Sequence, residues 1–375
     1  MALKLKSDWS LFVVTLTLVL TGVLMVFSSS AVLSKEWYGD PNHFALRHVV
    51  AVFLGLVSMF VLMKVNYHRY RDPAVVFSLL SVVTVLLVVA FLMPSSANTH
   101  RWIRFGGLSF QPAELGKLAL IVFMSYFLEK RKGRVNELGF TLIPVGAVSL
   151  LLAGLIVLQP DLGTALSMLI IVGILLFVSG LSFGWFALAG ALSVPILYVL
   201  IVLVPWRWER IISFLDPYAD PFGAGFQLIQ SWVAMGTGGV TGVGFMEGQQ
   251  KLFYMPEPHT DFIYAVVGEE WGLIGTVLVL VLFGLFLWRG LRGAARAPDA
   301  FGFYLALGIT MMIGVQAFVN MSVALGMLPT KGIPLPFISY GGSSFLIMLA
   351  AVGILMNVSQ QGIDDSFSAR QILRR

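Results

Sequence analysis

A group of acidic residues and one histidine lies just before and inside an apolar stretch of the chain. Glu257, His259 and Asp261 stand close together, and Glu269 and Glu270 follow about two helical turns later. A carboxylate next to a hydroxyl can act as a general base and turn the hydroxyl into a nucleophile. Asp261 could equally cap the helix that follows, although a cap does not explain the acidic residues behind it.

A charged pair opens another apolar segment. In the run Gln111-Pro112-Ala113-Glu114-Leu115-Gly116-Lys117, Glu114 and Lys117 are three positions apart and therefore share one face of a helix. Charges at membrane depth are costly and usually face the interior of a helix bundle or a water-filled cavity. The plainer interpretation is an ion pair that holds helices together, and the alternative is direct contact with a substrate.

A segment near the C-terminus breaks helical structure at membrane depth. It runs from Leu328 to Ser344 and contains three prolines and the pair Gly341-Gly342. Irregular backbone at such depth is tolerated only where protein buries it or a cavity hydrates it. Lys331 would bring a positive charge to that cavity.

Two further motifs have simpler explanations. The run Gln159-Pro160-Asp161-Leu162-Gly163-Thr164 fits a tight turn between two helices, with Asp161 capping the second helix. The glycine-rich stretch 236–244 matches neither the dinucleotide-binding pattern nor the P-loop pattern. We interpret it as a flexible stretch of backbone.

The composition places these groups in a membrane protein. Of the 375 residues, 58% are hydrophobic and 11% are charged, whereas soluble domains carry roughly 25% charged residues. Lipid must therefore be the solvent for most of the surface. The net charge of +5 does not require a nucleic-acid partner, because Lys and Arg gather in loops expected to face the cytoplasm. Cysteine is absent, which excludes disulfides and thiolate chemistry, and the five histidines show no metal-ligand spacing.

Apolar segments long enough to cross the bilayer recur along the whole chain. A crossing of about 30 Å needs about 20 apolar residues in a helix. The sequence therefore predicts an all-α integral membrane protein, a single polytopic bundle of about ten transmembrane helices over residues 1–375. The expected spans are 11–33, 46–63, 74–93, 112–128, 139–158, 162–180, 183–204, 262–287, 301–326 and 335–358.

The distribution of basic residues sets the orientation, because loops rich in Lys and Arg stay in the cytoplasm. An even number of crossings puts both termini on one side. The basic loops at 64–71, 130–134 and 289–296 put that side, with the tail 361–375, in the cytoplasm. The long loop 205–260, between the seventh and eighth helices, is then extracytoplasmic. Its many aromatic residues argue against disorder, so we expect re-entrant or interfacial segments there.

The motifs together resemble the SEDS (shape, elongation, division and sporulation) family, in the same order and over nearly the whole chain. Within the family, the run Lys251-Leu252-Phe253-Tyr254 is closer to the division members than to the elongation members, which act in rod shape. Departures are minor: Tyr264 stands where phenylalanine is usual, and Phe226 where tyrosine is common. The segments that carry the resemblance are 111–117, 159–164, 209–217, 225–227, 251–270 and 328–344.

The resemblance implies an enzyme: a peptidoglycan glycosyltransferase that polymerises lipid II on the outer face of the bacterial cytoplasmic membrane during division at the septum. It also implies partners, namely a class B penicillin-binding protein that crosslinks the new strand and other membrane proteins of the division machinery. Asp261 matches the position of the family's essential aspartate, so we expect it to be the general base.

The implied reaction makes further demands on the site. The 4-hydroxyl of one glycan attacks the anomeric carbon of another and displaces a polyprenyl pyrophosphate. This group leaves without a proton, so the second carboxylic acid of a glycosidase is not required, but its developing charge needs cations. We expect Lys331 and Arg210 to supply them, and the sequence does not decide whether a divalent cation assists. The other residues expected to bind substrate are Glu257, His259, Ser339 and Ser343.

A transporter that moves lipid II across the membrane is the main alternative from another class. Intramembrane Glu114 and Lys117, together with broken helices, would also suit a transporter. Against it, the chain lacks an obvious inverted repeat and its acidic cluster lies on one side of the membrane only. An elongation polymerase is the alternative within the family.

Overall fold

The structure, a computed structural model, describes residues 8–93, 99–105, 108–252, 255 and 258–361. It is built from helices and one hairpin, in which Ile103 pairs with Phe110. In chain order the elements are α1 (Trp9–Tyr38), α2 (His43–Lys64), η1 (Tyr67–Arg71), α3 (Pro73–Leu92), β1 (Ile103–Phe105), β2 (Leu108–Phe110), α4 (Pro112–Lys130), η2 (Leu138–Leu142), α5 (Ile143–Leu158), α6 (Leu162–Val178), α7 (Phe183–Val202), α8 (Pro205–Leu215), η3 (Pro217–Ala219), α9 (Phe226–Gly238), α10 (Ile263–Ala295), α11 (Ala300–Ala324) and α12 (Gly342–Gln360).

A helix occupies each position where the sequence predicts a span, which confirms the all-α membrane architecture. In the described part of the chain, eight helices are long and apolar enough to cross a bilayer. These eight count η2 and α5 together as one span, Leu138–Leu158. The helix α6, with 17 residues, is shorter than any of the eight, and α4 carries the charged pair Glu114 and Lys117. The exact number of crossings therefore stays a prediction.

The expected span 335–358 is wrong at its start. The helix α12 begins only at Gly342, and the described chain between Leu325 and Gly341 forms no regular helix. Pro334 and Pro336 have no N–H to donate to a helix. Phe337 adopts the left-handed region with φ 62°, which ends any remaining helical path.

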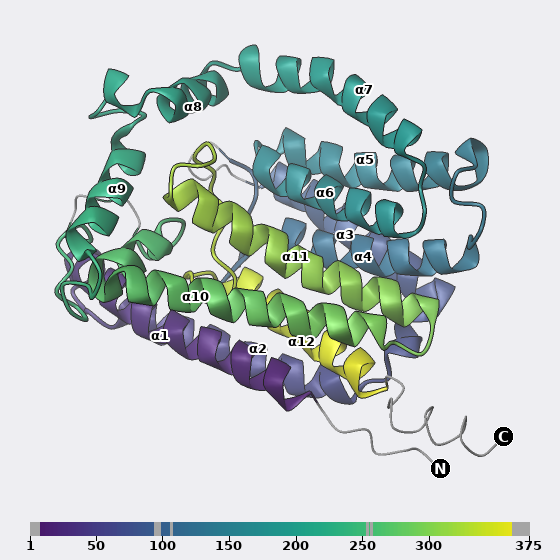
Figure 1. Ribbon diagram of the computed structural model, residues 1–375, viewed down its shortest axis with the longest axis horizontal. Helices are drawn as coiled ribbons and strands as arrows, with labels where there is room; N and C mark the ends of the chain where they lie inside the picture. The colour runs from purple at the N-terminus through teal and green to yellow at the C-terminus, as the bar shows by residue number, and fades with distance from the viewer. Residues whose placement is uncertain (1–7, 94–98, 106–107, 253–254, 256–257, 362–375) are drawn as a thin grey trace.

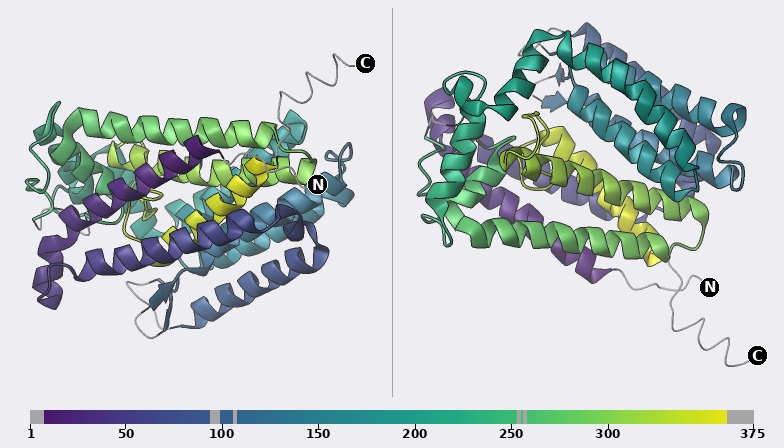
Figure 2. Two further views of the ribbon diagram at one scale, coloured as in Figure 1. Left: turned by 90° about the horizontal axis from the view of Figure 1, so that it is seen from below. Right: turned by 45° about the horizontal axis from the view of Figure 1, so that its top comes forward.

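The helix α11 lies at the centre of the bundle and packs against α4, α6, α10 and α12 (Figure 1). The start of α1 and the end of α12 lie at one end of the molecule. The hairpin β1–β2 and the irregular segment 325–341 lie towards the other end (Figure 2). The start of α1 and the end of α12 thus lie away from the hairpin and the irregular segment. The residues of the candidate site belong to the end with the hairpin and the irregular segment.

The segment after α6 departs from the bundle. The helix α7 runs along its outer edge (Figure 1), and none of its residues is buried. In the expected long loop 205–260, the described residues include two helices, α8 and α9, and α9 packs against α10. The described part of this loop is therefore ordered, and its place at the membrane interface stays a prediction.

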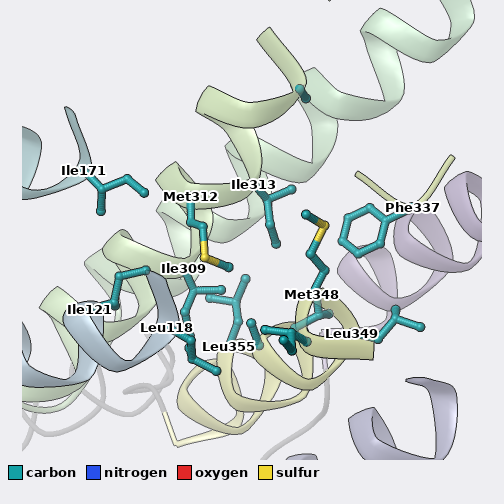
Figure 3. Close-up of a cluster of buried hydrophobic side chains, with 14 of the residues drawn as sticks. Leu118, Ile121, Ile171, Ile309, Met312, Ile313, Phe337, Met348, Leu349 and Leu355 are labelled. Carbon is teal, nitrogen blue, oxygen red and sulfur yellow. The ribbon is translucent and has the colours of Figure 1, made fainter. Parts of the chain in front are cut away.

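Close packing holds the centre of the bundle together. Side chains such as Ile121 of α4, Ile309 of α11 and Leu355 of α12 meet there and are almost completely buried (Figure 3). In lipid the hydrophobic effect does not draw helices together, so intimate contact and hydrogen bonds must do so. A Cβ atom added at Gly353 of α12 would lie 2.5 Å from the carbonyl oxygen of Met59 in α2, so these two backbones touch.

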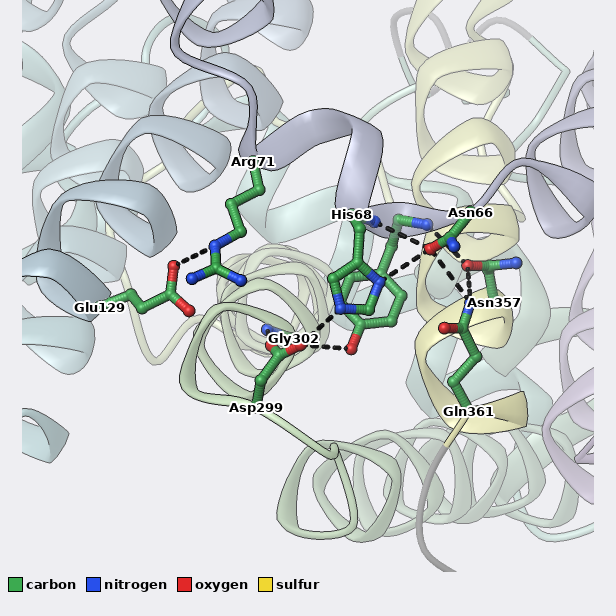
Figure 4. A network of polar contacts seen from close by, with 9 residues as sticks. Asn66, His68, Arg71, Glu129, Asp299, Gly302, Asn357 and Gln361 are labelled. Atoms are coloured by element: carbon green, nitrogen blue, oxygen red, sulfur yellow. Dashed lines mark hydrogen bonds and ion pairs between the residues drawn. The ribbon is translucent and has the colours of Figure 1, made fainter. Parts of the chain in front are cut away.

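A polar network ties helix ends together at the end of the molecule where α1 begins (Figure 4). Asp299 caps α11 and accepts hydrogen bonds from Gly302 N at 2.6 Å and the Tyr67 hydroxyl at 2.8 Å. Asn357 of α12 accepts a hydrogen bond from Tyr67 N at 2.9 Å, and Arg71 pairs with Glu129 at 2.8 Å. The turn between α2 and α3 is therefore joined to α4, α11 and α12.

Candidate active site

The helix α10, which follows Asp261, is interrupted where a loop enters it. Gly272 has φ 66° and ψ −160°, values that fit glycine and break the helical hydrogen bonds. The glycine-rich stretch after α9 supplies replacements: Val243 N donates to Glu269 O at 3.0 Å, and Leu273 N donates to Gly239 O at 2.9 Å. The glycine-rich stretch, interpreted from the sequence as flexible, is therefore held by hydrogen bonds to α10.

The two carboxylates inside α10 hold the same loop. Glu270 Oε1 lies 2.6 Å from Lys251 Nζ and accepts a hydrogen bond from the Ser28 hydroxyl at 2.5 Å. Glu269 Oε1 accepts a hydrogen bond from Gln249 N at 2.7 Å. Both carboxylates are buried, so these contacts account for the acidic residues behind Asp261 without any substrate.

Asp161 caps α6, as the turn motif predicts. Its Oδ1 accepts a hydrogen bond from Thr164 N at 3.1 Å, and Gln111 Nε2 donates to Oδ2 at 3.2 Å. The same Oδ2 lies 3.8 Å from Nη1 of Arg101, a residue just before β1. Asp161 thereby holds Arg101 beside the turn between α5 and α6.

Asp261 lies half-buried just before α10, next to the irregular segment that carries Lys331. A Cβ atom added at Gly332 would be 3.1 Å from Asp261 Oδ2 and 3.9 Å from Arg101 Nη1. The carboxylate and the guanidinium therefore face the same short piece of backbone. Three segments that are distant in the sequence meet at this point.

Arg210 of α8 belongs to the same charged neighbourhood. Burial lowers the pKa of its guanidinium, the positive charge of Arg101 lowers the pKa further, and the negative charge of Asp261 raises it. These two influences require Arg101 and Asp261 to lie near Arg210. The structure thus brings the predicted Arg210 to the predicted Asp261.

Lys331 lies in the same irregular segment, towards the turn between α5 and α6. Its Cδ would be 3.5 Å from a Cβ atom added at Gly163, the second residue of α6. Burial lowers the pKa of the Lys331 ammonium. Among the ion pairs between described residues, none involves this ammonium.

Three other expected substrate contacts have structural partners instead. The Ser339 hydroxyl donates to Thr260 O at 2.6 Å, and Ser343 Oγ accepts a hydrogen bond from Gln111 N at 3.0 Å. His259 is 3% exposed and packs against the Phe44 ring at a centroid distance of 4.9 Å. These contacts stabilise the loops, and the expected substrate roles of the three residues stay predictions. Glu257 and the tail from residue 362 onwards lie outside the described residues.

The expected pairing of Glu114 and Lys117 is present in α4, where Lys117 Nζ lies 2.8 Å from Glu114 Oε1. The pair has further partners on other helices: the Ser344 hydroxyl donates to Glu114 at 3.1 Å, and Lys117 donates to Gln316 Oε1 at 2.6 Å. Each of the two charged side chains is 3% exposed. The pair therefore connects α4 to α11 and α12 inside the bundle.

Sequence reasoning missed Arg101 at the site and two amides on α11, Gln316 and Asn320. Arg101 counted only as a loop charge, because nothing local distinguishes it from other basic residues. The amides did carry a signal: they are four residues apart in an apolar helix, hence on one face, and polar groups at that depth seek partners.

The arrangement suits the activation of a hydroxyl beside an anionic group. Asp261 can accept a proton, and Arg101, Arg210 and Lys331 supply positive charge from three different segments. In the described residues, no three His, Asp or Glu side chains are placed to hold one metal ion.

Comparison with known proteins agrees with this architecture. A family model described as cell cycle protein, for FtsW, RodA and SpoVE, matches residues 8–363. A probable peptidoglycan glycosyltransferase FtsW of Geobacter metallireducens is 42% identical over 94% of this chain and 95% of its own. Stage V sporulation protein E of Bacillus subtilis is 40% identical over 95% of this chain and 98% of its own.

Solved structures give the same result. A chain from a peptidoglycan synthase complex that coordinates polymerization and crosslinking matches with a TM-score of 0.78 and 32% identity, over 96% of this chain and 99% of that one. The rod shape determining protein RodA of Thermus thermophilus matches with a TM-score of 0.70 and 28% identity, over 96% and 98%. The fold and the site thus define a multi-pass membrane protein of the SEDS class. The chain belongs to the FtsW, RodA and SpoVE family.

Proposed function

We propose that this chain is a peptidoglycan glycosyltransferase of the division type, which polymerises lipid II with Asp261 as the general base. The observation that carries the proposal is that the half-buried carboxylate of Asp261 and the guanidinium of Arg101 face the same piece of backbone at Gly332. Arg210 lies in the same charged neighbourhood, and Lys331 directly precedes Gly332. The relatives named probable peptidoglycan glycosyltransferase FtsW, at 42% identity, supply the reaction class and favour division over elongation.

In the proposed mechanism Asp261 takes the proton of the acceptor 4-hydroxyl as its oxygen attacks the anomeric carbon of the donor. The bond from that carbon to the pyrophosphate oxygen breaks, and its electron pair leaves with the pyrophosphate. Arg101, Arg210 and Lys331 would stabilise that charge, which builds up in the transition state. Attack from the face opposite the leaving group inverts the anomeric centre. The lipid tail would stay in the bilayer throughout.

The transporter alternative loses one of the two features that suggested it, the intramembrane charged pair. Glu114 and Lys117 are buried and hydrogen-bonded to Ser344 and Gln316. Such a closed ion pair fits a structural role better than a path for a polar headgroup.

The proposed function implies a location and a partner for the enzyme. The loop side of the bundle would face outward, with both termini in the cytoplasm and the enzyme at the septum. A class B penicillin-binding protein would crosslink the product, which is supported by the similarity to a chain from a synthase complex. Other membrane proteins of the division machinery would share the assembly.

Polymerisation of lipid II by the purified full-length protein tests the proposal. The protein is reconstituted in liposomes with labelled lipid II, with and without a class B penicillin-binding protein. We expect glycan strands that lysozyme digests. Absence of polymer in both samples, with movement of labelled lipid II between leaflets, would contradict the proposal and favour the transporter.

A further inference from the structure

One amide on α11 contacts both segments that carry the proposed chemistry. Asn320 Nδ2 donates to the backbone carbonyl of Asp261 at 2.7 Å and to that of Ile333 at 2.8 Å. An amide nitrogen has two hydrogens, and here each one holds a different segment. Both partners are carbonyl oxygens, so only the nitrogen can face them, which fixes the orientation of the amide.

Gln316 makes the neighbouring contact, one turn earlier on the same face of α11. Its Nε2 donates to Pro334 O at 3.0 Å, and its Oε1 accepts a hydrogen bond from Lys117 Nζ at 2.6 Å. Lys117 in turn pairs with Glu114. The buried ion pair of α4 is therefore connected, through Gln316, to the segment that carries Lys331.

Neither amide is open to a substrate, because Asn320 and Gln316 are each 2% exposed. They can act on the reaction only through the backbone that they hold. The distance between the Asp261 carboxylate and the backbone of the irregular segment is short, because a Cβ atom added at Gly332 would lie 3.1 Å from Asp261 Oδ2. A misplacement of about 1 Å at a reacting centre can lower a rate by about 10²-fold.

We propose that Asn320 is a positioning residue that sets the spacing between Asp261 and the segment carrying Lys331, and that Gln316 joins the Glu114–Lys117 pair to that segment. This inference rests on the proposed function, in which Asp261 and Lys331 act on the same reaction. Irregular backbone at membrane depth must find its hydrogen bonds within the protein. Without Asn320, two carbonyls lose their donor and the segment is free to shift.

The first test compares Asn320→Leu, which keeps the size and removes both donors, with the wild-type protein. At saturating lipid II we expect the rate of the purified full-length variant to fall by about 10²-fold, with a much smaller change in KM. The matched control is Thr310→Val, which removes a buried hydroxyl whose hydrogen bond, among the described residues, goes to Ala306 O of its own helix at 2.7 Å. Equal rates for Asn320→Leu and wild type would contradict the inference.

A double-substitution cycle with Lys331→Met separates positioning from general damage. If Asn320 acts by placing Lys331 against Asp261, Asn320→Leu should cost much less in the Lys331→Met background than in the wild type. Thr310→Val should have the same effect in both backgrounds. Fully additive losses for Asn320 and Lys331 would overturn the positioning role.

Hydrogen exchange of the backbone gives a readout that needs no activity. In Asn320→Leu, exchange should rise in peptides covering 325–341 and 258–262, whereas Thr310→Val should leave them at the wild-type rate. Unchanged exchange in Asn320→Leu contradicts the inference. If exchange rises but the wild-type protein does not polymerise lipid II, the proposed function fails while the positioning role stands.

Discussion

At the scale of single residues, the site depends on charges that converge from distant segments. Asp261 comes from the turn just before α10, Arg210 from α8, and Lys331 from the irregular segment before α12. Their types and depth were readable in the sequence. Arg101 was not, because its place beside Gly332 and Asp161 follows only from the fold.

For the rate of polymerisation, the positive charge of Lys331 should matter more than the shape of its side chain. Replacement by Met removes a cation that the leaving pyrophosphate needs, and the loss of one such group typically costs about 10²- to 10³-fold in rate. Arg keeps the charge with a different geometry, so Lys331→Arg should retain more activity than Lys331→Met. The measurement is the initial rate of lipid II polymerisation. The control is Lys35→Met at an exposed lysine, and equal rates in all forms would exclude Lys331 from the mechanism.

His259 should make stability depend on pH. Burial lowers its pKa from 6.5 to about 4, so below pH 6.5 the unfolded chain binds a proton that the folded chain does not. The stability from the neutral imidazole is complete above pH 6.5 and is lost as the pH falls towards about 4. Replacement by Phe, which can stay between Phe44 and Tyr340, should reduce this loss. The measurement is the midpoint of thermal unfolding of both proteins from pH 7 down to about pH 4. If the midpoint depends on pH in the same way in both proteins, the prediction is wrong.

At the scale of elements, helix positions and the irregular segment before α12 were predictable, whereas the break inside α10 was not. Long apolar runs located α1 to α7 and α10 to α12 because a bilayer demands them. The prolines before α12 are visible in the sequence, but the hydrogen bonds that Asn320 and Gln316 make to this segment are not. The break at Gly272 depends on the stretch after α9. A single sequence does not show such partners.

Replacing one partner of the ion pair in α4 should destabilise the protein more than replacing both partners. Glu114→Gln or Lys117→Met alone leaves one charge buried, which typically costs about 3–5 kcal/mol. The double variant leaves none and should recover part of the lost thermal stability. Midpoints of thermal unfolding in detergent give the comparison. Single variants that are as stable as wild type but inactive would instead place the pair in the reaction.

At the scale of the whole molecule, the account requires the loop end of the bundle to face outward. The chain has no native cysteine, so single cysteines can be labelled without background. Ala219, at the end of η3, and Lys132, just after α4, are both exposed. In intact spheroplasts a membrane-impermeant maleimide should modify Ala219→Cys and should reach Lys132→Cys only after the membrane is opened. The reverse pattern would put Asp261 on the cytoplasmic side.

The central claim is that Asp261 is the base of a lipid II polymerase. The most direct test measures polymerisation by Asp261→Asn, a change that keeps the size of the side chain and removes its basicity. We expect a loss of about 10²-fold or more, with membrane insertion and thermal stability preserved. Asp40→Asn, at an exposed carboxylate in the turn after α1, should polymerise at the wild-type rate. Near-normal polymerisation by Asp261→Asn would contradict the account.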